Sequence, residues 1–298
     1  MAWIFGLAAL MLLDSDMVLN AVNGAAGVFV RSVMPALFPM MVLNGLSARL
    51  SGRERRWMTV GFCWLAGSPA SAQRLEGLRE RGELPERALL PLAAATGVMS
   101  PLFFVGSLGS RLPNPAGGWL LLTAHWLGAL AAAGLIHRLS RRFSSMEKAE
   151  TVRPEQRTAA GRTSLLAALP DSLRQAGTAL LSVCGAMMLF SILAAFFRQG
   201  LSFLLPGWAA NHPEVPALLW ALLEIGGGAH ALLGVSPTPD LPLLCALCSF
   251  GGLSIWMQNL LFLGKSIRPG KLLLLRLLHG AAAYGVCRML VRLFPSFL

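Results

Sequence analysis

Three long stretches without a single charged side chain limit the folds open to this chain more than any other feature. They run from Gly117 to Ile136, from Gly177 to Phe197 and from Pro242 to Leu263. A helix needs about 20 mainly apolar residues to cross the hydrocarbon core of a membrane. The polar faces that helices of a large water-soluble bundle would show are missing, and only 13% of all residues are charged. The sequence therefore predicts an all-α, polytopic transmembrane protein.

Segments broken by glycine and proline occupy corresponding places in the two halves of the chain. The breaks fall at 67–69 and 97–101 in the first half, and at 226–228 and 251–252 in the second. Interrupted helices are tolerated inside a membrane only where the freed backbone groups face protein or a water-filled cavity. Their occurrence at matching positions in two halves indicates the substrate site of a transporter.

The shared order predicts two inverted repeats, each with three spanning helices and one re-entrant hairpin. We expect a short N-terminal membrane helix at 1–16, a first repeat at 17–137, a basic linker at 138–163 and a second repeat at 164–298. Asp14 to Asp16 should end the first helix. The next should run from Gly27 to Leu50 and should be kinked by Pro35 and Pro39.

The distribution of Lys and Arg predicts the topology. Basic residues gather at 49–56, 74–87, 138–162 and 265–271, whereas 199–242 contains none. The positive-inside rule places the basic loops in the cytoplasm. The first hairpin then enters the membrane from the cytoplasm and the second from the opposite side. The net charge of +11 therefore reflects topology and lipid contact, and we expect no nucleic-acid partner.

Motifs for enzymes and cofactors are absent from the sequence. It has no HExxH, GxSxG, P-loop or dinucleotide-binding pattern, so we expect no enzyme, no cofactor and no metal site. The five cysteines lie in apolar sequence, and Cys245 and Cys248 fall inside a predicted membrane helix. We interpret them as buried thiols that behave as small apolar side chains.

The first broken hairpin and Glu224 supply the main candidate site residues. Helix N-termini at the hairpin tip would present N–H groups and a positive dipole end to an anion; a tight turn with a serine cap is the alternative. Glu224 is a carboxyl at membrane depth beside three glycines, which indicates a functional group. It either couples transport to a proton or cation, or caps the broken helix.

Two further polar faces follow from helical spacing. Ser254 and Gln258 lie four residues apart, and Arg276 and His279 three apart, so each pair shares one face of a helix. Hydrogen bonding between helices is the alternative for the first pair and snorkelling to the surface is the alternative for Arg276. We interpret His125 as a packed core residue. The predicted substrate-binding residues are Gly67, Ser68, Ser71, Gln73, Ser100, Glu224, Gly226, Gly227, Ser254, Gln258, Arg276 and His279.

The order of these motifs resembles the sporulation integral membrane proteins of the YlbJ type, within the nucleoside-recognition Gate domain group. The matching stretches are 67–74, 78–82, 100–103, 223–227 and 249–258, followed by Arg276 and His279. The chain departs from the family at Ser68, where a bulky residue is common. It also departs at 96–99, where the family commonly has paired asparagines.

The resemblance implies a protein of an endospore-forming bacterium, located in the membrane around the forespore. It implies transport of dipicolinic acid, a small planar dianion, by alternating access between the two repeats. A nucleoside or nucleobase carrier is one alternative, and a sporulation scaffold that transports nothing is another. The sequence leaves the coupling ion open.

Overall fold

The computed structural model describes residues 2–50, 56–144, 164–236 and 238–295, and every regular element in these ranges is a helix. Helix α1 (Ala2–Leu13) meets α2 (Ser15–Val28) at a bend of 96°. Asp14 lies at the bend, and its carboxylate accepts a hydrogen bond from the Met17 N–H at 3.3 Å. This N-cap confirms that the first helix ends at Asp14 and shows that the next one starts there.

The prediction that the second helix begins at Gly27 is wrong, because α2 continues without a break into η1 (Phe29–Val33) and α3 (Met34–Leu50). The small and polar residues before Gly27 obscured the amphipathic first turns. The segment η1 is π-helical and ends two residues before Pro35. A proline has no N–H and clashes with the carbonyl four residues earlier, so the wider turn accommodates Pro35 in a continuous helix.

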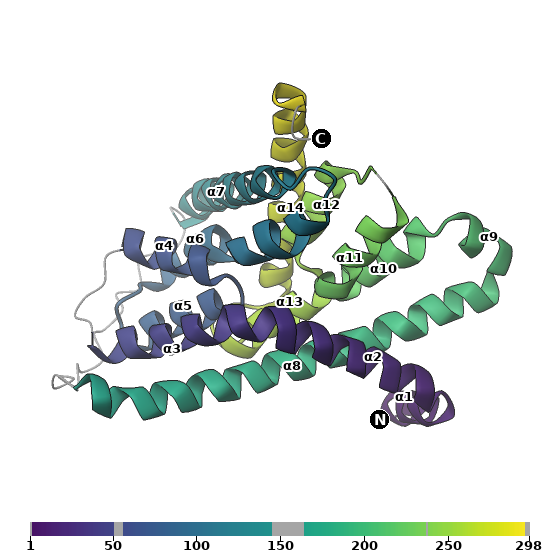
Figure 1. Ribbon diagram of the computed structural model, residues 1–298. Coiled ribbons are helices and arrows are strands. Elements are labelled where there is room, and N and C mark those ends of the chain that lie inside the picture. The colour runs from purple at the N-terminus through teal and green to yellow at the C-terminus, as the bar shows by residue number, and fades with distance from the viewer. Residues whose placement is uncertain (1, 51–55, 145–163, 237, 296–298) are drawn as a thin grey trace.

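The remaining elements repeat one order in the two halves (Figure 1). In the first half, the hairpin α4 (Arg56–Ala66)–α5 (Ala70–Glu80) precedes the broken helix α6 (Glu86–Thr96)–η2 (Leu102–Leu108)–η3 (Gly109–Arg111) and then α7 (Gly117–Ser144). In the second half, α8 (Leu165–Leu204) and the short α9 (Pro206–Asn211) precede the hairpin α10 (Glu214–Leu223)–α11 (Ile225–Val235), the broken helix α12 (Leu241–Phe250)–α13 (Gly252–Leu263) and α14 (Pro269–Leu293). The predicted breaks are thus confirmed, and the inverted relation of the halves stays a prediction.

Glycines make several of the breaks possible. Gly67 has a φ of 74°, Gly251 of 82° and Gly252 of 69°. These angles lie in the left-handed region that other residues adopt at a cost. The break between α10 and α11 is different, because Glu224 occupies it in an extended conformation.

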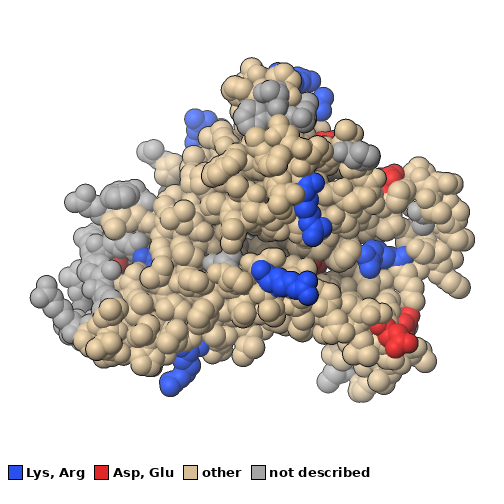
Figure 2. Space-filling view, in the orientation of Figure 1, with Lys and Arg blue, Asp and Glu red and all other residues tan. Residues whose placement is uncertain are grey.

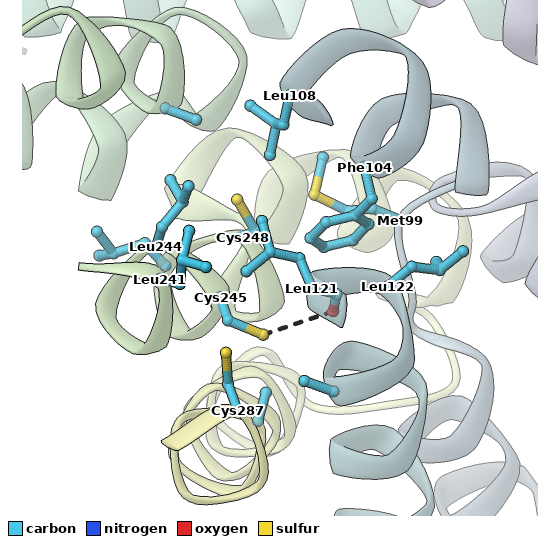
Figure 3. Packing of buried hydrophobic residues seen from close by; sticks show 14 of the residues in the cluster. Met99, Phe104, Leu108, Leu121, Leu122, Leu241, Leu244, Cys245, Cys248 and Cys287 are labelled. Atoms are coloured by element: carbon cyan, nitrogen blue, oxygen red, sulfur yellow. Dashed lines mark hydrogen bonds between the residues drawn. The ribbon is translucent and has the colours of Figure 1, made fainter. Parts of the chain in front are cut away.

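Long helices of the two halves pack against each other. The continuous helix α2–η1–α3 lies along α8, and α7 and α12 pack on α14 (Figure 1). A buried apolar cluster joins η2, α7, α12 and α14, with Phe104, Leu121 and Cys248 near its centre (Figure 3). The Cys245 thiol donates to the Leu121 carbonyl at 3.7 Å. All five cysteines are free; four are buried, as the sequence predicted, whereas Cys184 is partly exposed.

The described helices include four that are long and apolar enough to cross a membrane, or five when the bent pair α1–α2 is included. Large apolar side chains cover their outer surface: Leu181 is 75% exposed and Phe203 83%. Water would disfavour such a surface, whereas lipid tails match it. The chain is therefore an integral membrane protein.

Candidate functional site

A cavity of about 780 Å³ lies between the two halves of the described chain. Its walls come from α2, η1 and α3, from both hairpin tips and from both broken helices. The space-filling view shows a hollow on this face, with basic side chains on opposite rims and acidic atoms inside (Figure 2). The helix breaks that the sequence singled out therefore border one common space.

The structure brings only some of the predicted residues to this cavity. Ser68, Ser100, Glu224, Gly226 and Gln258 line it. The others lie elsewhere in the described structure: Gly67, Ser71, Gln73, Gly227, Ser254, Arg276 and His279.

The first hairpin tip is bonded to the first broken helix. The Ser68 N–H donates to the Val98 carbonyl at 2.6 Å, and the Ser68 and Ser71 hydroxyls lie 3.4 Å apart. The Gln73 side chain accepts from the Asn44 amide at 3.3 Å. The Ser68 N–H is therefore bonded to the opened backbone of the neighbouring break, and anion binding at the hairpin tip stays a prediction.

Glu224 caps the second break. Its carboxylate accepts the N–H of Gly226 and the N–H of Gly227, each at 2.7 Å, and the side chain is buried although it borders the cavity. The α11 amides hold the carboxylate, so of the two predicted roles the cap is confirmed.

Arg276 joins the two broken helices to each other. Its Nε donates to the Phe250 carbonyl at 2.7 Å, and its Nη1 donates to the Gly97 carbonyl. Both carbonyls end the helix before a break, α12 in one case and α6 in the other. Each helix C-terminus carries about half a negative charge, so the two ends together offset the guanidinium. Arg276 is only 4% exposed, and the alternative that it snorkels to the surface is wrong.

A pair of histidines supports the same region. The His125 Nε2 accepts from the Met99 N–H at 2.8 Å, so its Nδ1 carries the proton and donates to the Ser249 hydroxyl at 2.7 Å. His279 bonds to the His125 carbonyl at 2.9 Å, and the two rings lie 4.5 Å apart. This confirms His125 as a packed core residue and gives His279 a structural contact between α7 and α14.

The cavity also contains polar residues that the sequence analysis missed. The Ser107 hydroxyl and the His230 Nε2 lie 3.0 Å apart and link η2 to α11 across the two halves. The exposed Arg31 and Arg111 line the cavity as well. Arg31 had a usable signal, because it is the only charged residue between Asp16 and Arg49 and such residues at membrane depth are usually functional.

Comparisons of the chain with protein-family models, with curated proteins and with solved structures found no match. The resemblance to the YlbJ-type proteins therefore stays a prediction. Among the described residues, no group of three or more His, Cys, Asp or Glu side chains could hold a metal ion.

Proposed function

We propose that this protein transports a small organic anion across the membrane through the cavity between its halves. One observation carries the proposal: both hairpin tips and both broken helices border a single space that Arg31 and Arg111 also line. Broken helices at membrane depth need such a space, and carriers place their substrate there.

The charges around the cavity favour an anion. Arg31 and Arg111 contribute two positive charges, and the Glu224 carboxylate is already held by two backbone amides. An arginine presents a planar fork of donors that matches a carboxylate. Charged hydrogen bonds of this kind are about twice as strong as neutral ones.

Dipicolinate is the first candidate substrate, on the strength of the family resemblance. It carries two carboxylates, and the cavity offers two arginines. A volume of about 780 Å³ is within the usual range for small-molecule sites, about 300 to 1,000 Å³. A role in the forespore membrane of an endospore-forming bacterium is part of the same proposal.

Uptake of labelled dipicolinate and uridine into vesicles that contain the purified protein tests the proposal. We expect dipicolinate uptake to exceed uridine uptake, and Arg31→Gln and Arg111→Gln each to lower it about tenfold, as the loss of a charged hydrogen bond implies. Arg288→Gln is the control, because Arg288 is exposed and lies outside the cavity. Uridine uptake that both variants retain would favour a nucleoside carrier. Uptake of neither compound would favour the scaffold.

A further inference from the structure

A second and much smaller void lies beside the break after α6, and none of its lining residues lines the large cavity. Its volume is about 20 Å³, and it is enclosed by α5 and α6 of the first half and by α13 and α14 of the second. Ser71, Thr96, Asn259 and Arg276 line it together with leucines. Two of the predicted residues that do not reach the large cavity, Ser71 and Arg276, thus meet here.

Two of the residues that line this void each have a buried polar atom without a hydrogen-bond partner in the described structure. These atoms are the Nη2 of Arg276 and the Oδ1 of Asn259, and their side chains are only 4% and 5% exposed. Buried polar groups are nearly always paired. The void has room for about one water molecule. The guanidinium N–H of Arg276 is a strong donor to a carboxylate. If the side-chain amide of Asn259 flips, its NH₂ group takes the place of the oxygen and offers a second donor.

The void is closed by contacts between the two halves. Leu75 on α5 belongs to a buried cluster with Leu263, Leu272 and Leu275 of the second half. Next to it, the Ser266 hydroxyl donates to the Glu76 carboxylate at 2.7 and 2.9 Å. Lys265, Arg268 and Lys271 surround this contact in sequence, which places the closed end on the predicted cytoplasmic side.

The large cavity is open at its opposite end. Its lining includes the exposed Arg31, Ser110 and Arg111, and the hydrogen bond between Ser107 and His230 lies in its wall. That bond links η2 to α11. In the repeat order these elements correspond to α13 and α5, the elements that meet at the closed end. Equivalent pairs of helices are thus packed through buried leucines at the closed end and joined by a hydrogen bond in the wall of the open cavity at the other.

We propose that the small void is the closed cytoplasmic end of the transport path, and that Arg276 and Asn259 bind a carboxylate group of the substrate there once α5 separates from α13 and α14. The proposal rests on the transport function proposed above. The hydrogen bond between Glu76 and Ser266 holds this end closed. Arg276 then has two tasks: Nε and Nη1 fix the broken helices, and Nη2 receives the anion.

The test measures how fast thiol reagents reach the void in a Cys184→Ala background, which removes the one partly exposed native cysteine. Thr96→Cys reports on the void, and Ser110→Cys reports on the open cavity. The probes are membrane-impermeant methanethiosulfonates with a sulfonate or a trimethylammonium group. We expect Ser110→Cys to react quickly from one side and Thr96→Cys slowly from the other. Ser266→Ala should accelerate only Thr96→Cys, about tenfold, because it removes a hydrogen bond to a charged group.

The charge of the reagent tests the anion site separately. In the Ser266→Ala background, the sulfonate should modify Thr96→Cys about tenfold faster than the trimethylammonium reagent does, since Arg276 attracts it. Ser71→Cys is a second reporter if Thr96→Cys does not fold. Any of three results would overturn the proposal. Both reporters could be labelled from the same side as Ser110→Cys, Ser266→Ala could leave the labelling rate unchanged, or the two reagents could react at equal rates. These labelling rates do not depend on a substrate. A failed uptake assay would therefore reject the proposed transport function, whereas the labelling rates would still test the closed end and its anion site.

Discussion

Glu224 and Asp240 both cap a helix with a carboxylate, but only Glu224 is buried. An N-cap contributes about 0.5 to 2 kcal/mol, and a buried one leaves unpaired amides when it is lost. We expect Glu224→Ala to lower the free energy of unfolding by about 2 kcal/mol and Asp240→Ala by about 1 kcal/mol. Thermal and denaturant unfolding of the detergent-solubilised protein measures both. Equal losses would mean that burial adds nothing to the Glu224 cap.

Arg276 should be the most sensitive position on α14. Arg276→Gln removes the donors for the Phe250 and Gly97 carbonyls, and each buried acceptor left unpaired costs about 1 to 3 kcal/mol. We therefore expect a loss of about 3 kcal/mol in unfolding free energy and a smaller one for Arg276→Lys, which keeps the charge. Arg288→Gln on the exposed face of the same helix should change it by less than about 0.5 kcal/mol. If Arg276→Gln lowered the unfolding free energy as little as Arg288→Gln does, the bridging role of Arg276 would be refuted.

At the scale of the elements, two glycines of the first hairpin provide a matched pair. Gly67 has a φ of 74°, and a Cβ there would press on the backbone of Met99 and Ser100. Gly61 lies within α4 with nothing within 4 Å of its Cβ position. Gly67→Ala should destabilise the protein by at least about 1 kcal/mol, whereas Gly61→Ala should stabilise it by up to about 1 kcal/mol. Unfolding midpoints compare the two, and the same sign of change for both would contradict the model of the break.

The contact between α5 and the loop before α14 should depend on pH. Burial by itself raises the pKa of the Glu76 carboxyl, but hydrogen bonds from Arg79 and Ser266 and the charges of Arg79 and Lys265 outweigh it and hold that pKa below its usual 4.5. Because the pKa is lower in the folded state, this stabilisation is fully present above pH 4.5 and is lost as the pH falls through the lowered value. Glu76→Gln should flatten the fall in unfolding midpoint below pH 4.5, and the exposed Glu80→Gln should not. Parallel pH profiles for the two variants would contradict this assignment.

The sequence predicted the elements better than the roles of their residues. The breaks at Gly67, Glu224–Gly228 and Gly251 could be found because glycines interrupt apolar stretches, and local backbone chemistry decides such positions. The partner of each buried polar group could not be found, because it depends on contacts between distant segments. Arg276 reaches Gly97 across 179 residues of sequence, and no local pattern encodes that distance.

At the scale of the whole molecule, the position of the cavity was the main unknown. The tips were expected to meet at one site, and Ser68 and Glu224 do border one cavity. Arg31 on its other wall was missed, although it lies within the predicted helix from Gly27 to Leu50. Which face of a membrane helix looks inward is set by its neighbours, here α8 beside α2 and α3, and the even apolar pattern of the helix gives no sign of it.

The predicted inverted arrangement of the two halves leads to the last prediction, which concerns topology. The linker at 138–163 is rich in arginine, and the region from 199 to 242 has no Lys or Arg. Helix α8 separates them, and its 40 residues span about 60 Å, about twice the hydrocarbon thickness. Single cysteines at Ser145 in the linker, which is outside the described residues, and at Asn211 at the end of α9 should therefore react with an impermeant maleimide from opposite sides of the membrane. Leu166→Cys, at the exposed start of α8, should react from the same side as Ser145→Cys. If Ser145→Cys and Asn211→Cys react from one side, α8 does not cross the membrane and the halves are not inverted.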